Sequence, residues 1–414
     1  MRTRVRESDV RTLILQFTDI LGSLKAVMTP LRGVERALAG DVMFDGSALE
    51  GFVRVEEADM RLLPDVDTFV VDSWQDGVAR LICDIANPDG TPFDGCPRTQ
   101  LKRQLARLSA RGLDLEVLSE PEFFLYEQGT AVETEDLAGY FDFSPEDRGE
   151  AVRRAAVDAL ESMGVPVAAH HHEVSPGQHE IDLDACDALC AADRLAWLRI
   201  AIHSIAPTFG TYATFMPKPR FGINGSGLHL HLRLLQAGED VLADGADRHG
   251  LSSVGKRALA GLLQHAPAMT AVANPLVNSY KRLTPGYEAP VTVNWSLHQR
   301  SPLVRVVPGK PLSLEWRSPD PAANPYLVLA VAAAAMLDGI DRQLTLPPPL
   351  ESSTGERLPA DLSQAVQELA RDEVIAGALG VTIARNLREA KEIEWEIYQS
   401  QVHAWELEQY LRTF

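Results

Sequence analysis

Two glutamates and several histidines surround a Pro-Gly pair in HHHEVSPGQHEID, residues 170–182. Proline followed by glycine favours a tight turn. A hairpin closed by residues 175–178 would place Glu173 opposite Glu180, and like charges directly opposite each other destabilise a sheet. A cation between the two carboxylates would convert that penalty into binding. The stretch is therefore either one half of a metal site or an exposed hairpin with solvated glutamates.

A second pair of carboxylates, Glu120 and Glu122, lies directly before the apolar run Phe-Phe-Leu. Positions two apart share one face of a strand. Acids beside an apolar core segment are rarely buried unless they are paired or metal-bound. Pro121 between them predicts an edge strand or a strand start, because proline donates no ladder hydrogen bond. An exposed strand entry is the alternative interpretation.

Further candidate ligands alternate along two more predicted strands. His229 and His231 share a face of LHLHLRL, while Glu315 and Arg317 share a face of LEWRSPDP. The glycines of PRFGINGSG, just before the histidines, provide a backbone that can approach a ligand closely. Taken singly, a histidine at such a position is more often a hydrogen-bonded core residue than a ligand, and the Glu315–Arg317 pattern also fits a surface ion pair.

The segment NSYKRLTPGYEAPV, residues 278–291, combines cations, a Pro-Gly turn and Glu288, which favours a mobile flap carrying an acid. Arg300 and Arg305 follow, and the planar guanidinium suits phosphate or carboxylate oxygens. Oxygen-rich ligands favour Mg²⁺ or Mn²⁺ over zinc. Divalent ions and arginines together suit phosphoryl transfer, which indicates a metal-dependent enzyme that uses ATP.

Composition narrows the classes of protein. The chain has 414 residues, enough for two or three domains, and only four cysteines, too few for a disulfide framework. Its formal net charge of −19 argues against non-specific nucleic-acid binding. We find no apolar run of transmembrane length, and the N-terminus MRTRVRESDVRTL is charged where a signal peptide is apolar. We therefore expect a cytoplasmic protein with no membrane partner.

The elements that must position these residues follow from periodicity and breakers. Short strands and turns precede NPDGTPFDGCPR, residues 87–98, whose prolines and glycines predict a linker. We place the domain boundary there, dividing the chain into residues 1–95 and 96–414. Strands are expected at 113–126 and 228–235, and helices at 101–112, 148–164, 191–210, 324–343 and 391–411.

Six long motifs resemble those of type I glutamine synthetases and occur in the family's order. They are FDGSALEGFVRVEEADMRLLPD, EPEFFLY, HHHEVSPGQHEIDL, FMPKPRFGINGSGLHLHL, NSYKRLTPGYEAPV and EWRSPDPAANPYL. The resemblance extends from about residue 10 to the C-terminus. It implies an α+β fold, with an N-terminal β-grasp-like domain and a C-terminal catalytic domain built on an antiparallel, barrel-like sheet with surrounding helices. It also implies a dodecamer of two hexameric rings, with each active site shared between neighbouring subunits.

The chemistry implied by the resemblance has two steps. ATP phosphorylates the γ-carboxylate of glutamate, and ammonia then attacks the γ-glutamyl phosphate to give glutamine. Two alternatives stay open. One is a γ-glutamylamide ligase acting on a larger primary amine, such as a polyamine or ethanolamine. The other is a catalytically retired homologue that serves a regulatory or structural role.

The resemblance also implies a role for each matching residue. Two or three Mg²⁺ or Mn²⁺ ions would occupy each site, one bound by Glu122, Glu173 and Glu180 and another by Glu120, His229 and Glu315. Glutamate would contact Asn224, Gly225, Arg282 and Arg317, while Arg300 and Arg305 would stabilise phosphate. Around the ammonium the resemblance places Tyr140, the flap acid Glu288 and Asp45, which comes from a neighbouring subunit and helps to take the proton.

The sequence departs from the family pattern at three places. Ala48 replaces the second serine of the usual DGSS, which either weakens ammonium binding or makes room for a larger amine. Ser313 stands where an arginine normally contacts nucleotide phosphate, and the segment 306–314 looks about two residues shorter than usual. We expect Lys310 to compensate as a nucleotide-binding cation.

Overall fold

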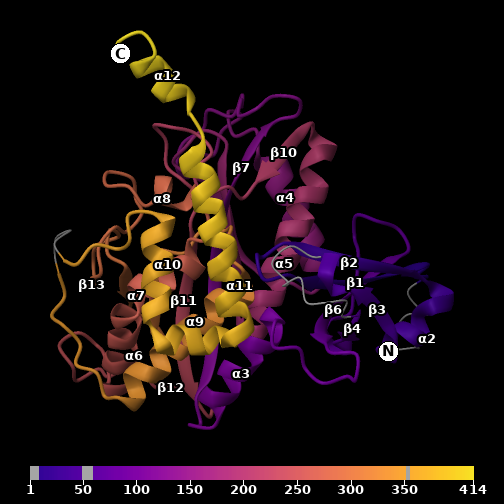
Figure 1. The fold of residues 1–414 in the computed structure, drawn as a ribbon, viewed down its shortest axis with the longest axis horizontal. Helices are drawn as coiled ribbons and strands as arrows, with labels where there is room; N and C mark the ends of the chain where they lie inside the picture. The colour runs from indigo at the N-terminus through magenta and orange to yellow at the C-terminus, as the bar shows by residue number, and fades with distance from the viewer. Residues whose placement is uncertain (1–8, 49–58, 351–354) are drawn as a thin grey trace.

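The computed structural model describes residues 9–48, 59–350 and 355–414, drawn in Figure 1. Residues 49–58 of the motif FDGSALEGFVRVEEADMRLLPD lie outside these ranges. Two sheets organise the described residues, one formed before residue 90 and a larger one formed after residue 110. None of the helices in these three ranges is long and apolar enough to cross a bilayer.

The N-terminal sheet has the strand order β2-β1-β6-β4-β3, with β5 also paired to β6. Its strands are β1 (Thr12–Thr18), β2 (Leu24–Pro30), β3 (Val42–Asp45), β4 (Asp59–Pro64), β5 (Val70–Val71) and β6 (Val78–Ala86). Helix α2 (Val34–Leu38) packs on it. Alternate residues of β1 and β6, such as Leu13, Leu15 and Leu81, enter one small core because side chains two apart share a face.

Ile82, from the opposite face of β6, joins the main core of the chain instead. The two parts are also joined by Arg98, whose guanidinium pairs with Asp193 at 2.8 Å and with Asp65 at 2.8 Å. Asn324 donates from Nδ2 to the backbone oxygen of Asp19 at 2.9 Å. These buried polar contacts fix the N-terminal sheet against the helices of the larger part.

The larger sheet has the order β13-β14-β15-β11-β7-β9-β8, with β10 paired to β7 and β12 to β11. Its strands are β7 (Asp114–Glu127), β8 (Val167–His172), β9 (Gln178–Asp187), β10 (Thr211–Thr214), β11 (Leu228–Gln236), β12 (Glu239–Asp240), β13 (Trp295–Ser296), β14 (Val304–Val307) and β15 (Ser313–Trp316). All the described pairings are antiparallel except β13 with β14. The expected α+β architecture with a curled antiparallel sheet is confirmed.

Helices cover this sheet and complete its core. They are α3 (Pro97–Ser109), α4 (Glu150–Ser162), α5 (Ala188–Ile205), α6 (Ser253–Gln264), α7 (Ala266–Ala273), α8 (Ser279–Arg282), α9 (Pro325–Asp341), α10 (Leu362–Arg371), α11 (Glu373–Ser400) and α12 (Ala404–Tyr410). The alanine-rich α9 is almost wholly buried and packs against α3, α6 and α11. Asn324 caps its N-terminus and Pro325 occupies the first turn, where a missing N–H has no consequence.

Two local predictions were wrong. Pro121 lies inside β7, a central strand, rather than at an edge. The sheet tolerates it because the β7–β11 pairing ends at Pro121, and the β7–β9 partners skip from Ser119 to Glu122. The expected single helix at 391–411 is broken after Ser400, where a capping box at His403 and Glu406 starts α12. Figure 1 shows α12 extending away from the body.

Candidate active site

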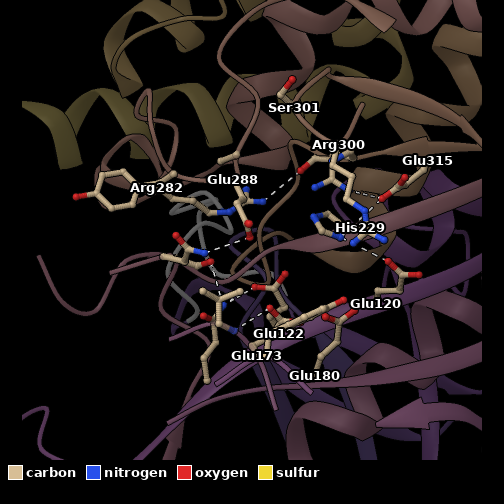
Figure 2. A pocket seen from close by; sticks show the side chains of 18 of the residues that line it. Glu120, Glu122, Glu173, Glu180, His229, Arg282, Glu288, Arg300, Ser301 and Glu315 are labelled. Carbon is tan, nitrogen blue, oxygen red and sulfur yellow. Dashed lines mark hydrogen bonds and ion pairs between the residues drawn. The ribbon is translucent and has the colours of Figure 1, made fainter. Parts of the chain in front are cut away.

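A cavity of about 370 Å³ opens over the middle strands of the large sheet and is lined mostly by charged side chains. All six predicted metal ligands line it, as do the predicted substrate and phosphate residues Tyr140, Asn224, Gly225, Arg282, Glu288, Arg300, Arg305 and Arg317. Figure 2 shows the side chains converging from several strands and loops. The structure thus brings together residues that lie up to 197 positions apart in the chain, from Glu120 to Arg317.

Strand register explains the convergence. Across neighbouring strands, Glu315 pairs with His231, His229 with Glu120, Glu122 with Glu180, and Glu180 with His171. Directly paired residues on adjacent strands place their side chains on the same face. A row of carboxylates and imidazoles therefore runs across β15, β11, β7, β9 and β8, perpendicular to the strands.

One cluster of ligands in this row is rich in cations. His229 Nδ1 lies 3.5 Å from Glu120 Oε2 and 4.0 Å from Glu315 Oε1, while Arg317 Nη1 donates to Glu315 Oε1 at 2.5 Å. Arg305 Nε donates to the other oxygen of Glu315. Burial alone would raise the pKa of Glu120, but hydrogen bonds from His229 and His231 lower it well below its usual range. Burial alone would also raise the pKa of Glu315, but the charges of Arg317 and His229 lower it, so both carboxylates are ionised and can bind a cation.

His231 is a ligand candidate that sequence reasoning passed over in favour of His229. Its Nε2 lies 2.9 Å from Glu120 Oε1, and His231, Glu120 and Glu315 offer ligand atoms within 4.8 Å of one another. Its Nδ1 lies 3.1 Å from Ser313 Oγ. Ser313 is buried against the His231 ring. The signal in the sequence that could have identified His231 is that it shares a strand face with His229.

The other cluster is dominated by carboxylates. Glu173 Oε1 lies 3.4 Å from His171 Nδ1, and Glu180 Oε2 lies 3.8 Å from His171 Nε2. Burial, followed by repulsion from Glu122, raises the pKa of Glu173 to about 8 and that of Glu180 well above its usual value. Burial likewise raises the pKa of Asp182, a further cavity acid that the sequence did not single out, to about 6.

The donor set in both clusters fits Mg²⁺ or Mn²⁺, since it consists of carboxylate oxygens with one or two imidazole nitrogens. Ionising buried acids with raised pKa values destabilises the folded protein, and a bound cation offsets that cost by supplying positive charge. The Glu122 carboxylate is already oriented, because Gln178 Nε2 donates to it at 2.6 Å and Gly227 N at 2.9 Å.

The predicted register of the hairpin was wrong, although the two glutamates do meet. Glu180 lies opposite His171, and the backbone of Glu173 donates to Gln178 O at 2.8 Å. The turn at 175–178 forms as expected, with Gly177 at a φ of 69°. Val174 and Ser175 join Pro176 and Gly177 in a four-residue loop, so the register shifts by two positions and the two acids lie diagonally in place of directly opposite.

Glycines bring the backbone against the cluster. A side chain at Gly225 would place its Cβ 2.2 Å from Pro217 O, and one at Gly227 would lie 2.8 Å from Arg282 Nη2 and 3.1 Å from Glu122 Oε1. Neither position therefore accepts any other residue without movement of the backbone or of the cavity residues. The loop also places Asn224, whose backbone N–H donates to Ser175 Oγ at 2.9 Å.

The arginines differ in how free their donors are. Arg282 is buried, and its Nη1 donates to the carbonyls of Ser318 at 2.7 Å and Pro319 at 3.1 Å. Burial lowers the pKa of Arg282. Its guanidinium thus braces the β15–α9 connection while one edge faces the cavity. Arg300 is only partly engaged, through a hydrogen bond with Tyr140 that raises its pKa.

The predicted flap lies over the cavity entrance. Glu288 Oε2 accepts from Asn224 Nδ2 at 3.2 Å. The ammonium group of Lys218 lies 3.6 Å from the ring centroid of the adjacent Tyr287, and Lys218 is buried, with only 7% of its surface exposed. These two contacts attach residues 287–288 to the glycine loop and close this side of the cavity.

Two predicted residues lie outside the cavity. Lys310 is exposed in the turn between β14 and β15, so the structure does not bring it to the position that Ser313 leaves without an arginine. Asp45 ends β3 on the N-terminal sheet, where its carboxylate accepts from Ser47 N at 2.9 Å and Ser47 Oγ at 2.6 Å. Within one chain, Asp45 does not line the cavity.

Replacing Glu173 by glutamine tests the charge state of this cavity. The folded-state pKa of about 8 exceeds the ordinary 4.5, so in metal-free protein the parent loses stability as the pH rises from about 4.5 to 8. Glutamine removes this penalty, and we expect the thermal midpoint of metal-free Glu173→Gln to exceed that of the parent by roughly 2–5 °C at pH 8 and by almost nothing at pH 5. Scanning fluorimetry at both pH values measures it.

Saturating Mn²⁺ supplies the control for that experiment. With the ion bound, the ionised Glu173 carboxylate stabilises the folded state by binding Mn²⁺. The parent should then have the higher thermal midpoint at pH 8. A pH-independent difference between parent and variant, with or without metal, would show that Glu173 is an ordinary ionised surface acid.

Comparison with known proteins agrees with this geometry. Residues 94–410 match the family model "Glutamine synthetase, catalytic domain", and residues 9–88 match "Glutamine synthetase, beta-Grasp domain". The chain belongs to the glutamine synthetase family. The family consists of ligases, and its β-grasp and catalytic domains correspond to the two sheets described above.

Two relatives within the glutamine synthetase family illustrate the similarity. A glutamine synthetase of Thermus thermophilus is 48% identical over 99% of this chain and 98% of its own length. One from Staphylococcus aureus is 46% identical over 100% and 98%. Among solved structures, "GmaS/ADP complex-Conformation 1" aligns with a TM-score of 0.94 and 34% identity, covering 99% of both chains, and "Apo GmaS without ligand" aligns with 0.92 and 33% over the same shares.

Proposed function

We propose that this chain ligates ammonia to the γ-carboxylate of glutamate, using ATP and divalent metal ions, and so forms glutamine. The observation that carries the proposal is the row of carboxylates and imidazoles across five strands, flanked by Arg300, Arg305 and Arg317 in one cavity. Two clusters of ligands and nearby guanidinium groups suit a phosphoryl group in transfer, because catalysis of that step is mainly positioning and charge stabilisation.

Two groups of residues would hold the metal ions. Glu122, Glu173 and Glu180 would hold one, and Glu120, Glu315 and His229 would hold the other, since all six line the cavity. Ligand atoms lie within 4.8 Å of one another in the overlapping groups His171, Glu173, Glu180 and Glu120, His231, Glu315. When bound, Mg²⁺ or Mn²⁺ neutralises phosphate oxygens and orients them. Two or three ions per site and ATP as co-substrate remain the family-based expectation.

The proposed reaction has two steps. A γ-carboxylate oxygen of glutamate attacks the terminal phosphorus of ATP, which releases ADP and gives γ-glutamyl phosphate. Arg300 and Arg305 would stabilise the oxygens of the transferring group, since both guanidinium groups face the cavity. Ammonia then attacks the acyl carbon, and inorganic phosphate leaves.

The substrate glutamate would lie along the glycine loop. Asn224 and Gly225 would contact its amino-acid head, and Arg282 and Arg317 would attract its carboxylates. The ammonium would lie between Tyr140, Glu173 and Glu288, where anionic groups favour a cation. Asp45 of a neighbouring copy would accept its proton.

We further propose the domain limits 1–95 and 96–414, a cytoplasmic location and a dodecamer of two hexameric rings. The apolar side chains of α12 and its flanks support assembly, because Trp405 is 60% exposed, Leu411 71% and Phe414 100%. Removing residues 401–414 should therefore reduce the mass of the assembly in solution. Mass photometry measures this, and an unchanged dodecamer would mean that other surfaces hold the rings together.

An amine panel is the experiment that tests the proposed activity. Phosphate release is followed with ATP, Mg²⁺, glutamate and each of ammonium, methylamine, ethanolamine and a polyamine. We expect ammonium to give the highest kcat/KM. Release only with larger amines would replace glutamine synthesis by γ-glutamylamide synthesis, and no release with any amine would leave a retired homologue.

A γ-glutamylamide ligase is the second candidate, and two observations favour it. The aligned GmaS structures are those of a γ-glutamylmethylamide synthetase, and Ala48 removes a hydroxyl from the usual DGSS. The glutamine synthetases, at 46–48% identity, are nearer to this chain than the GmaS structures at 33–34%. Ammonia is therefore the amine we propose.

The Lys218 contact predicts leakage when it is removed. In Lys218→Met the flap loses a cation–π interaction worth roughly 0.5–2 kcal/mol, and the glycine loop loses the hydrogen bond from Lys218 Nζ to Ile223 O, so we expect KM for ammonium to rise about 2–30-fold. ATP hydrolysis without amine should also increase, since an open flap admits water to the acyl phosphate.

Lys281→Met is the matched control for the flap variant. The Lys281 ammonium also faces a tyrosine ring, at 5.3 Å from the centroid of Tyr398, but that ring belongs to α11 and not to the flap. Coupled and uncoupled phosphate release should both stay at parental values. Equal behaviour of the two variants would mean that Lys218 does not hold the flap.

A further inference from the structure

A buried charged cluster lies behind the metal hairpin and lines no part of the cavity. Its members are Asp136, Asp147, Arg153, His172 and His179. Asp136 is 2% exposed, Arg153 3%, His172 1% and His179 0%. Charges are found at such depth only when they are paired and hydrogen-bonded. The contacts of the cluster show which segments these paired charges hold together.

Asp136 is the centre of the cluster. Its Oδ1 lies 3.0 Å from His172 Nε2 and accepts from Ala138 N at 3.3 Å. Its Oδ2 lies 3.3 Å from His179 Nε2 and accepts from Gly149 N at 3.1 Å. One carboxylate thus joins the loop that precedes α4 to both strands of the β8–β9 hairpin.

The neighbours define the charge of each ring. His172 Nδ1 lies 2.5 Å from Glu173 O, so both of its nitrogens face acceptors, an arrangement that favours the imidazolium form. His179 Nδ1 faces Arg153 Nη1 at 2.6 Å, and a guanidinium only donates. His179 is therefore neutral, with its hydrogen on Nε2 toward Asp136.

The cluster is balanced without a further ion. Arg153 donates to both oxygens of Asp147, at 3.0 and 2.6 Å. Two positive groups, His172 and Arg153, thus match two negative ones, Asp136 and Asp147. Although four of the side chains offer ligand atoms within 4.8 Å of one another, a divalent cation would add unmatched charge next to Arg153.

His172 and His179 connect the cluster to residues that line the cavity. The His172 ring holds the carbonyl of Glu173, and His179 immediately precedes Glu180 in β9. On the other side, Phe141 N donates to His172 O at 3.2 Å, and the Phe141 ring packs on His171 at 4.5 Å and stacks on Tyr140 at 4.1 Å. Gly149 permits the close approach, since a Cβ there would lie 2.2 Å from the His179 ring.

We propose that Asp136 is a positioning residue that fixes the hairpin bearing Glu173 and Glu180 and the loop bearing Tyr140 in one arrangement. The inference rests on the proposed function in taking Glu173 and Glu180 as metal ligands and Tyr140 as part of the amine site. Asp136 acts through His172 and His179 and touches no substrate.

Asp136→Asn tests this by metal binding. An amide must turn its NH₂ toward one of the two ring nitrogens that face the carboxylate, so the hairpin loses an anchor without a change in volume. We expect Mn²⁺ affinity, measured by calorimetry without substrates, to fall about 10–100-fold at one class of site, as is usual when a residue that orients a ligand is lost. Glu180→Gln identifies which binding event belongs to that site. In turnover, KM for ammonium should rise more than kcat falls.

Asp338→Asn is the matched control. Asp338 holds the similarly buried His265, whose Nε2 lies 3.0 Å from Asp338 and whose Nδ1 lies 2.6 Å from Asp372, among helices that do not line the cavity. This variant should lose thermal stability to a similar degree while keeping parental Mn²⁺ affinity. Equal losses of affinity in both variants would reduce Asp136 to a purely structural residue.

Two further outcomes decide the proposal. Parental Mn²⁺ affinity in a folded Asp136→Asn would overturn it. Should that variant not fold, Asp147→Asn loosens the same cluster through Arg153, and an affinity reduced about threefold would support the proposal, whereas unchanged affinity would reject it. Because calorimetry needs no turnover, a parent that binds Mn²⁺ tightly but forms no glutamine would refute the proposed function and leave the positioning role intact.

Discussion

Replacing Glu180 by glutamine is expected to lower kcat/KM for glutamine formation by about 10³-fold or more, equivalent to at least ~4 kcal/mol of transition-state stabilisation. Glu180 is buried at the centre of the carboxylate-rich cluster, opposite both Glu122 and His171 in adjacent strands. An amide of the same shape removes one anionic ligand and leaves the packing in place. The loss should therefore appear in catalysis and not in folding.

The stability of the same variant gives an independent check. Burial and repulsion from Glu122 raise the pKa of Glu180, so the metal-free variant should be at least as stable as the parent at pH 8. Glu116→Gln is the matched control, because Glu116 lies on β7 but pairs with Arg233 at 2.9 Å, outside the cavity. We expect its kcat/KM to stay within about twofold of the parent. An active Glu180→Gln would remove the carboxylate-rich cluster from the mechanism.

Replacing Asp45 by asparagine is expected to lower kcat/KM for ammonium by about 10²–10⁴-fold, the usual contribution of a general base. The residue is exposed at the end of β3 and does not line the cavity of its own chain. Hydrogen bonds from Ser47 lower the pKa of Asp45 and keep it ionised. If it acts in a neighbouring subunit, its loss can be complemented by mixing.

Hybrid assemblies make that test specific. When Asp45→Asn and Glu180→Gln subunits are mixed 1:1, about one quarter of the sites should combine an intact cavity with an intact Asp45 from the neighbour. Activity should therefore recover well above that of either variant alone. Mixing Asp45→Asn with a chain carrying both substitutions should recover none. Hybrids that form but stay inactive would contradict the shared site, and Asp59→Asn on the paired strand controls for damage to the N-terminal sheet.

The sequence predicted most of the cavity because its ligands occur in short, position-specific patterns. Alternation along LHLHLRL and EPE is enough to assign a strand face, and pairing of neighbouring strands then brings Glu120 beside His229. Alternation does not show which residues of two neighbouring strands lie opposite each other. Val174 and Ser175 lengthen the loop by two residues, which keeps both acids on one face but places them diagonally and not directly opposite.

Other differences arise from tertiary contacts that no local pattern encodes. Pro121 is accepted in a central strand because neighbouring hydrogen bonds are redistributed to Gly227 and Pro319. Arg282 lines the cavity as predicted, but no local pattern showed that Nη1 of its guanidinium also donates to two carbonyls of a segment about 36 residues away. Lys310 is exposed between β14 and β15 and does not line the cavity, so its role toward nucleotide stays a prediction.

Isotope transfer tests the central claim most directly. Glutamate labelled with ¹⁸O in its γ-carboxylate is incubated with ATP, Mg²⁺ and ammonium, and the released phosphate is analysed by mass spectrometry. Ligation through γ-glutamyl phosphate predicts that each phosphate carries one ¹⁸O from glutamate, because the acyl carbon–oxygen bond breaks when ammonia attacks. Phosphate released without ¹⁸O would show that the terminal phosphoryl group goes to water and would contradict the proposed reaction.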